Sequence, residues 1–410
     1  MACIVPFSAY RYTSKAGPLR YLLTQPYDKI TPAMQQAYLA SSPHNLVRII
    51  LGSRCPGDND RENVYTRAKQ SFDEWISEGI LGQDARPSIY AYAQQFALPD
   101  GGSTLIRKGF IALGPVEEYQ AGVVHRHEET LAGPKKDRLE LLRATRAHFG
   151  QIFMLYPDPD LTVDGILDNA SSEDVSKVED EYGTIHSIRR ISDPGVIANI
   201  RQLMGDKKLV IADGHHRYET ALAFRRENPE VPGARNVMAT FVNMYSPGLK
   251  ILATHRVISN LPNFDSDRLL QQTRARELAS LAELKTELNT PAPDRLRIGI
   301  ALRGSAKTYL IDRPRNPGEL DVQTLHRDIL AGILHIDREA VVNESYIQYV
   351  RGADAAVERL TSDGQVAFLL QPTTVQQVAD VAFSGGVMPQ KSTDFYPKLL
   401  SGLTIYKIDE

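Results

Sequence analysis

The chain is poor in cysteine, has no long apolar run and carries almost no excess of charge, and each absence excludes a class of protein. Two cysteines in 410 residues, Cys3 and Cys55, provide neither a disulfide framework nor a four-cysteine zinc site, so a reducing cytoplasm is expected. No apolar stretch reaches the ~20 residues that cross a bilayer, and MACIVPFSAYRY lacks the features of a signal peptide. A net charge of −3 argues against a dedicated binder of nucleic acid or membrane surfaces.

Common catalytic signatures are missing as well. The sequence has no Walker phosphate loop, no GxGxxG fingerprint and no GxSxG nucleophile elbow.

The composition is that of a globular protein, 42% hydrophobic and 24% charged, and the length predicts two or three domains. We expect a multidomain α/β protein with mixed α+β sheets, divided into an N-terminal α/β region at 1–155, a middle region at 156–262 and a C-terminal α/β region at 263–410.

The stretch KLVIADGHHRYETALAFRRE, residues 208–227, is the most informative part of the sequence. Residues 209–212 form a short apolar run typical of a buried strand, and Asp213-Gly214 has the chemistry of a turn. An amphipathic helix follows. The residues at the N-terminal end of this helix are Gly214, His215, His216 and Arg217. Unpaired N–H groups and the helix dipole make such an end a natural site for phosphate or carboxylate.

Two other interpretations of this turn stay open. Its polar residues can simply cap the helix and solvate the turn. Adjacent histidines diverge and rarely chelate one ion, so zinc is not expected, although Asp213 could help to hold a hard ion such as Mg²⁺. A bound anion would remove the conflict between the cationic side chains and the helix dipole, which amounts to ~0.3–1 kcal/mol.

The N-terminal region supplies two further candidates. Asp28 lies in the turn of PYDKIT, before a helix that Thr31 caps. Residues 44–52 indicate a strand that carries Arg48 among apolar neighbours, where an arginine usually needs an anionic partner. For Asp28, capping of the preceding turn is the alternative.

Three longer stretches complete the structural expectations. Residues 88–97 and 107–113 predict a hairpin around Asp100 and two glycines. The acidic, Ser/Asp-rich residues 159–183 suggest a surface excursion. The charged residues 263–295 predict a single helix with an apolar stripe.

Two polar clusters lie outside the central motif. In VVHRHEETLAGPKKDRLE, residues 123–140, Glu128 is a candidate base or metal ligand, and Lys135 or Arg138 a candidate phosphate contact. A charged loop with a solvated helix start would explain the same pattern. In MPQKSTDFYPK, residues 388–398, lysine stands beside hydroxyl groups, as in a phosphate cradle. A solvent-exposed turn is the alternative there.

The motifs PYDKIT, SPHNLVRIILG, HEETLAGPKKDRL, IADGHHRYETAL, ATHRVI and MPQKSTDFYPKLLSG together resemble the bacterial domain-of-unknown-function family 1015, almost end to end. The region around DGHHR also resembles the ParB/sulfiredoxin-type fold, in which a strand, a G-x-x-R turn and a helix N-terminus bind phosphate. Some relatives of that fold are free-serine kinases that use ADP. Members that resemble the present family have been linked to serine phosphorylation with pyrophosphate.

The resemblance implies a phosphotransferase, a kinase that converts L-serine to O-phosphoserine with pyrophosphate or a nucleotide as donor and Mg²⁺ as cofactor. The catalytic candidates are Asp213, which would bind Mg²⁺ or orient the nucleophile, Glu128 and His216. The phosphate- and substrate-binding candidates are Gly214, His215, Arg217, Asp28, Arg48, Lys135, Arg138, Lys391, Ser392 and Lys398. Glu128 or Asp28 would accept the hydroxyl proton, and Arg48 would face the substrate carboxylate.

A non-catalytic regulator of ParB-like fold that binds a nucleotide or phosphate is the competing interpretation. The acidic balance counts against DNA partition, and a sulfiredoxin-like enzyme would need a cysteine where His215 stands. The expected partners are a small-molecule substrate and a phosphate donor, with no nucleic acid and no membrane. Homodimer formation stays open, as does whether the KST segment reaches the DGHHR turn.

Overall fold

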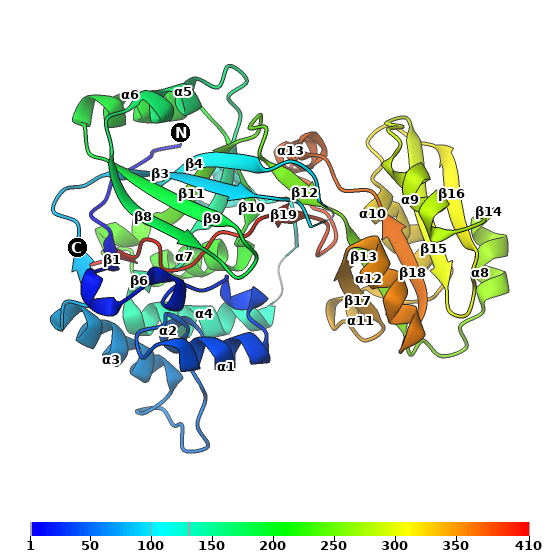
Figure 1. Cartoon of the computed structure of the whole chain (residues 1–410), viewed down its shortest axis with the longest axis horizontal. Helices are drawn as coiled ribbons and strands as arrows, with labels where there is room; N and C mark the ends of the chain where they lie inside the picture. The colour runs from blue at the N-terminus through cyan, green and yellow to red at the C-terminus, as the bar shows by residue number, and fades with distance from the viewer. Residues whose placement is uncertain (1, 100, 130–131, 410) are drawn as a thin grey trace. The chain divides into compact units, whose positions relative to one another are not determined.

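The chain folds into two compact units in the computed structural model (Figure 1). The structure describes residues 2–99, 101–129 and 132–409. The first unit comprises residues 1–126, 130–250 and 397–410, and the second comprises residues 127–129 and 251–396. Each unit packs helices against its own sheet, which confirms the multidomain α/β class. Among the described residues, no helix is long and apolar enough to cross a membrane.

The first unit is built on an eight-stranded mixed sheet with the order β5-β10-β7-β11-β4-β3-β9-β8. In that order the strands are Val124–His125, Leu209–Asp213, Ile152–Tyr156, Asn236–Asn243, Leu105–Pro115, Ile89–Phe96, Ile185–Ile191 and Glu173–Glu179. Strand β10 pairs in parallel with β5 and antiparallel with β7. Because strands from the expected regions 1–155 and 156–262 interleave in this sheet, most of those two regions lies in one unit, and the unit bounds differ from the three regions expected.

Helices cover both faces of this sheet. Helices α5 and α6 lie on one face, and α7 and α4 lie on the other with the N-terminal helices beyond them (Figure 1). The helices are α1 Pro32–Ser41, α2 Val47–Ile50, α3 Val64–Ser77, α4 Ala132–Thr145, α5 Thr162–Asn169, α6 Pro194–Met204 and α7 His215–Glu227. With both faces covered, the central strands are buried almost without interruption, as β7 and β10 illustrate.

Two expectations for this unit are wrong. Residues 44–52 do not form a strand, because Val47–Ile50 is the short helix α2, and a brief apolar run cannot distinguish a strand from a buried helical turn. Residues 159–183 are not a surface excursion, because they contain α5 and the sheet-edge strand β8, whose side chains are mostly exposed and give no apolar alternation. The hairpin of β3 and β4 is confirmed, whereas Asp100 lies outside the described residues.

The second unit contains a six-stranded antiparallel sheet with the order β14-β16-β15-β18-β13-β17. In that order the strands are Arg276–Leu278, Thr308–Pro314, Arg295–Leu302, Gly364–Leu370, Thr254–Ser259 and Ile347–Arg351. The helices are α8 Ser266–Thr273, α9 Leu281–Asn289, α10 Asp321–Thr324, a π-helix at Leu325–Ala331, α11 Arg338–Val342, α12 Ala353–Glu358 and α13 Val375–Phe383. Two-stranded pairs elsewhere in the chain are β1 Tyr10–Tyr12 with β2 Leu81–Gln83, β6 Ala147–His148 with β20 Tyr406–Lys407, and β12 Lys250–Leu252 with β19 Asp394–Tyr396.

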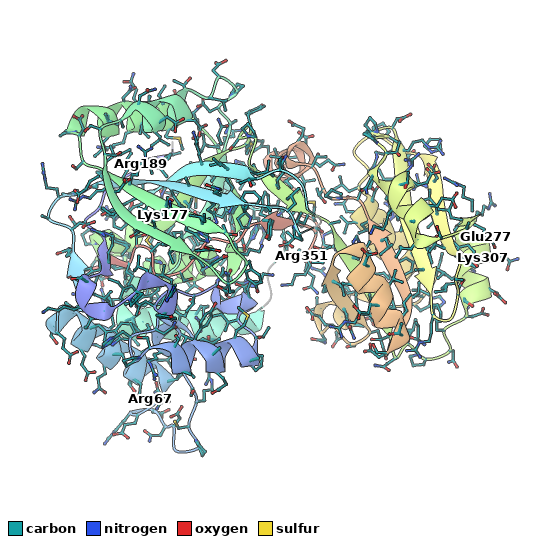
Figure 2. The ribbon with its side chains drawn as sticks, in the orientation of Figure 1. Arg67, Lys177, Arg189, Glu277, Lys307 and Arg351 are labelled. Atoms are coloured by element: carbon teal, nitrogen blue, oxygen red, sulfur yellow. The ribbon has the colours of Figure 1, made fainter. Side chains whose placement is uncertain are left out.

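The single helix expected at 263–295 is wrong as well. Helix α8 ends at Thr273, before Arg274 with its left-handed φ of 51°, and β14 then pairs with β16 before α9 begins. Charged side chains on this edge form exposed ion pairs, such as Glu277 with Lys307 (Figure 2). Exposed pairs of this kind contribute little to stability, so the fold depends on its apolar cores.

The core of the first unit supplies a stability test. Phe241 on β11 is fully buried and stacks on Phe110 with ring centroids 5.1 Å apart. Phe241→Ala should lower the free energy of unfolding by about 3–5 kcal/mol because it removes buried surface and leaves a cavity, as measured by urea unfolding. Tyr182→Ala, at a side chain that is 59% exposed, should change it by less than about 0.5 kcal/mol. Equal changes in the free energy of unfolding for the two variants would contradict the placement of Phe241 in the core.

Candidate functional site

The predicted strand-turn-helix around DGHHR is confirmed. Strand β10 ends at Asp213, Gly214 takes the left-handed conformation with φ of 92°, and α7 begins at His215. The Gly214 N–H donates to Asp213 Oδ1 over 2.7 Å. Gly214 is the N-cap residue and has no side chain that could cap α7, and the positive end of the helix dipole lies at this turn. His215 is buried and His216 is half-buried in this first turn.

Arg217 folds back over the turn. A Cβ atom on Gly214 would lie only 3.0–3.1 Å from the Arg217 guanidinium, so the close approach, like the positive φ, requires glycine at this position. Arg217 Nη1 donates to the Gln151 carbonyl over 2.6 Å. The guanidinium therefore lies at the N-terminal end of α7, where it adds a full charge to the helix dipole.

Asp213 stands among several cations. Lys398 Nζ donates to Asp213 Oδ2 over 3.1 Å, and the two side chains are only 10% and 26% exposed. Burial raises the pKa of the Asp213 carboxyl, but Lys398, Arg217 and Lys29 outweigh it and hold that pKa well below its ordinary value. One carboxylate thus faces three cations, and the local charge is positive.

A buried network positions Lys398. Gln94 Nε2 donates to the Lys398 carbonyl over 2.8 Å, and Arg107 donates to Gln94 Oε1 and to the Pro397 carbonyl. Arg107 is 1% exposed, and its guanidinium lies 4.6 Å from the centre of the Phe153 ring. Burial lowers the pKa of Arg107 to about 10, while Tyr92 and Asp213 favour its charged form. This cation is therefore charged at neutral pH and adds to the positive field around Asp213.

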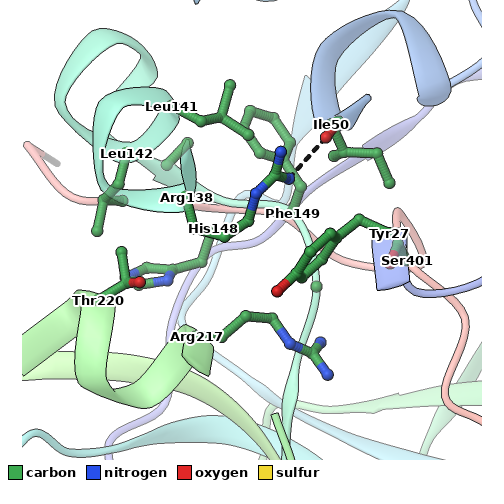
Figure 3. Close-up of a pocket in the computed structure, with 12 residues that line it drawn as sticks. Tyr27, Ile50, Arg138, Leu141, Leu142, His148, Phe149, Arg217, Thr220 and Ser401 are labelled. Atoms are coloured by element: carbon green, nitrogen blue, oxygen red, sulfur yellow. Dashed lines mark hydrogen bonds between the residues drawn. The ribbon is translucent and has the colours of Figure 1, made fainter. Parts of the chain in front are cut away.

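A cavity of about 70 Å³ lies beside Arg217, enough for several water molecules. Tyr27 lies between Arg138 and Arg217 in this cavity (Figure 3). The Arg138 guanidinium is 4.3 Å from the centre of the Tyr27 ring and donates to the Ile50 carbonyl. Burial, then the charge of Asp28, raises the pKa of Tyr27 to about 12, so its hydroxyl stays protonated at neutral pH.

The other candidates of the first unit have protein partners. Lys135 forms an ion pair with Glu219 on α7. Arg48 donates to the carbonyls of Leu39 and Ser42, so the expected anionic partner is replaced by backbone oxygens. Asp28 is exposed in the 3₁₀ helix Tyr27–Lys29.

The remaining candidates belong to the second unit. Glu128 Oε1 accepts the backbone N–H of Lys391 over 2.7 Å, and Lys391 has a left-handed φ of 58°. The Ser392 hydroxyl donates to the Pro389 carbonyl, and His127 Nε2 lies 2.9 Å from Thr393 Oγ1. The structure thus brings Glu128 to the KST segment within one unit and Lys398 to Asp213 within the other. A pocket shared by both groups stays a prediction.

Sequence reasoning missed Lys29, Gln94, Arg107 and His148. Lys29 stood in the quoted PYDKIT motif, and Arg107 stood at the start of the strand expected at 107–113. His148 lines the cavity and stacks on Tyr406, and burial lowers its pKa to about 4, so it is neutral at neutral pH. Gln94 gave no sequence signal, because its partners lie at 107 and 398.

The site does not fit a metal ion held by the protein alone. Among the described residues, no group of three or more histidine, cysteine, aspartate or glutamate side chains could hold one. Asp213 already accepts from Gly214 and Lys398, and the surrounding cations would repel Mg²⁺. Asp213 is therefore a cation-paired carboxylate in this structure.

The comparisons identify the family. The model of the family described as "Protein of unknown function (DUF1015)" matches residues 4–329, and the chain belongs to this family. No curated protein matches the sequence.

Several solved structures are similar over most of the chain. A conserved hypothetical protein from Pyrococcus furiosus is 10% identical with a TM-score of 0.38, covering 73% of this chain and 96% of its own. A free serine kinase in complex with AMP is 10% identical with a TM-score of 0.40, covering 73% and 91%. SbnI with a C-terminal truncation from Staphylococcus aureus is 14% identical with a TM-score of 0.37, covering 72% and 87%. TM-scores of this size carry no inference about the activity of this chain.

The ionised Asp213 carboxylate generates a pH prediction. A carboxyl group with a lowered folded-state pKa stabilises the fold fully above its unfolded pKa of about 3.9, and this stabilisation is lost as the pH falls further. The difference in unfolding free energy between wild type and Asp213→Asn should therefore shrink steadily below about pH 4. Urea unfolding at several pH values measures it. Asp60→Asn, at an exposed carboxylate, is the control, and a pH-independent difference for Asp213→Asn would contradict the ion pairing.

Proposed function

We propose that this chain is a phosphotransferase that phosphorylates the hydroxyl of a small amino acid, with L-serine as acceptor and pyrophosphate or a nucleotide as donor. The observation that carries the proposal is the set of three cations that face the single Asp213 carboxylate at the start of α7. An unbalanced positive charge at the N-terminal end of a helix is the chemistry that phosphate requires. The sequence resemblance supplies the acceptor and the choice of donors.

The donor phosphates would lie over the turn of β10 and α7. The helix start at Gly214, His215 and His216 would face the phosphate oxygens with the positive end of its dipole, as at other helix N-termini. Arg217 already reaches over Gly214, so its guanidinium would contact the same phosphate without a large movement. Lys398 would keep Asp213 paired and add positive charge.

The proton of the acceptor hydroxyl needs a different carboxylate from Asp213. A base works best when its pKa lies near the working pH, and the pKa of Asp213 is far below it. Asp28 and Glu128 are the two candidates. Asp28 is favoured, because its charge acts on Tyr27, which lies in the cavity beside Arg217. The protonated Tyr27 hydroxyl would donate a hydrogen bond to a phosphate oxygen.

A ³¹P NMR assay with L-serine, Mg²⁺ and pyrophosphate, ADP or ATP in separate reactions tests the proposal. We expect an O-phosphoserine signal with one donor. Arg217→Ala should slow its formation by roughly 10- to 100-fold, because a hydrogen bond from a charged group contributes about 1.5–3 kcal/mol.

Arg226→Ala is the matched control. Arg226 lies on the same helix, but its side chain is 63% exposed and pairs with Glu118, so its loss should leave the rate unchanged. Equal rates of phosphoserine formation for the two variants would show that Arg217 does not contribute to the reaction. No phosphoserine with any donor would reject serine phosphorylation. Donor resonances that still shift on binding would then favour the regulatory interpretation.

A further inference from the structure

The second unit contains a small polar cavity at the start of α13. Its volume is about 20 Å³, and its lining includes Thr254, Arg256, Thr373, Gln377 and Ser392. These residues come from β13, from the N-terminal end of α13 and from the KST segment. The cavity is separate from the Asp213 turn, which belongs to the first unit.

Arg256 is the unusual member of this lining. It is 1% exposed, and its guanidinium donates to the carbonyls of Thr254 and Lys391 and lies 5.3 Å from the centre of the Tyr349 ring. Its Nε has no hydrogen-bond partner among the residues that the structure describes. Burial lowers the pKa of Arg256 to about 10, with Tyr349 and Glu128 favouring the charged form, so it is a cation at neutral pH. A buried cation with an unused N–H is costly unless an acceptor meets it.

Helix α13 adds to the positive potential. Thr374 caps it in a capping box, in which Gln377 Oε1 accepts the Thr374 N–H over 2.9 Å. The capping contact of its oxygen orients the Gln377 carboxamide, and Gln377 lines the cavity. The positive end of the helix dipole lies at the same place.

The carboxylate of Asp321 also lines the cavity, and it forms an ion pair with Arg315. Asp321 Oδ1 lies 2.7 Å from Arg315 Nη2. Burial raises the pKa of Asp321 to about 6, and Arg315 acts against that rise. Arg315 is therefore the cation paired with Asp321, although Asp321 Oδ1 accepts no hydrogen bond from the described residues, and Arg256 is a further cation in the same lining.

We propose that this cavity binds one small oxyanion, a tetrahedral inorganic anion or a carboxylate group, through Arg256 Nε, Gln377 and the Thr254 hydroxyl. A single anionic oxygen suffices to meet the unused Nε–H, and the cavity has room for a group of this size. The site goes beyond the proposed phosphotransfer, and either can exist without the other.

The test uses the full chain and compares variants that place a negative charge at the cavity or away from it. Equilibrium dialysis with ³⁵S-sulfate is run on Arg217→Ala, so that the turn at Asp213 contributes less to binding. Adding Gln377→Glu keeps the capping oxygen and sets a carboxylate beside Arg256, and should weaken the remaining sulfate binding by roughly tenfold or more. Adding Gln376→Glu places the same charge one residue away on the exposed side of α13 and should leave binding unchanged.

Acetate in parallel titrations separates the two sources of the anion. Binding of sulfate that Gln377→Glu weakens and Gln376→Glu does not supports a site for tetrahedral anions. The same pattern with acetate alone supports a carboxylate site. Equal binding by the two glutamate variants, or no binding of either anion, would overturn the proposal. Urea unfolding of each variant checks that it is folded.

Discussion

The arrangement of the turn in the first unit depends on one interaction, the pairing of the Asp213 carboxylate with Lys398. Asp213 ends a central strand, whereas Lys398 belongs to the last residues of the chain. Both groups are largely removed from water, so their attraction is screened much less than that of a surface pair. Breaking the pair would leave a buried charge without its partner, which costs several kcal/mol. The pair therefore fixes where the C-terminal segment crosses the turn.

The same geometry explains why the turn is cationic. Gln94 and Arg107, on the adjacent strands β3 and β4, hold the carbonyls of Pro397 and Lys398. Arg107 contributes a buried charge while it serves this structural role. The Arg217 guanidinium also lies close to the turn, where Gly214 has no side chain to meet it. Several cations thus act on one carboxylate, and an anionic ligand would restore the balance of charge.

Sequence patterns predicted those structural features that depend on residues close together in the chain. The strand, the left-handed glycine and the helix start at 209–217 follow from residues that are neighbours in sequence, and the Thr31 cap of α1 does as well. Pairings over long distances in the sequence were not predictable in this way. Lys135 was expected to contact phosphate but pairs with Glu219, and the links between Gln94, Arg107 and Lys398 span up to 304 positions. Helix α2 escaped prediction because the three apolar residues around Arg48 satisfy either periodicity.

The charge state of Asp213 also constrains any chemistry at this turn. A carboxylate that its cations keep ionised gains little by taking a proton from a hydroxyl group, because the resulting acid would lose those ion pairs. Asp213 orients Lys398 and the Gly214 N–H, because it accepts a hydrogen bond from each of them. Under the proposed phosphotransfer, the proton of the acceptor hydroxyl would therefore have to pass to a different carboxylate. Within the same unit the carboxylate of Asp28 is exposed, and its charge acts on Tyr27.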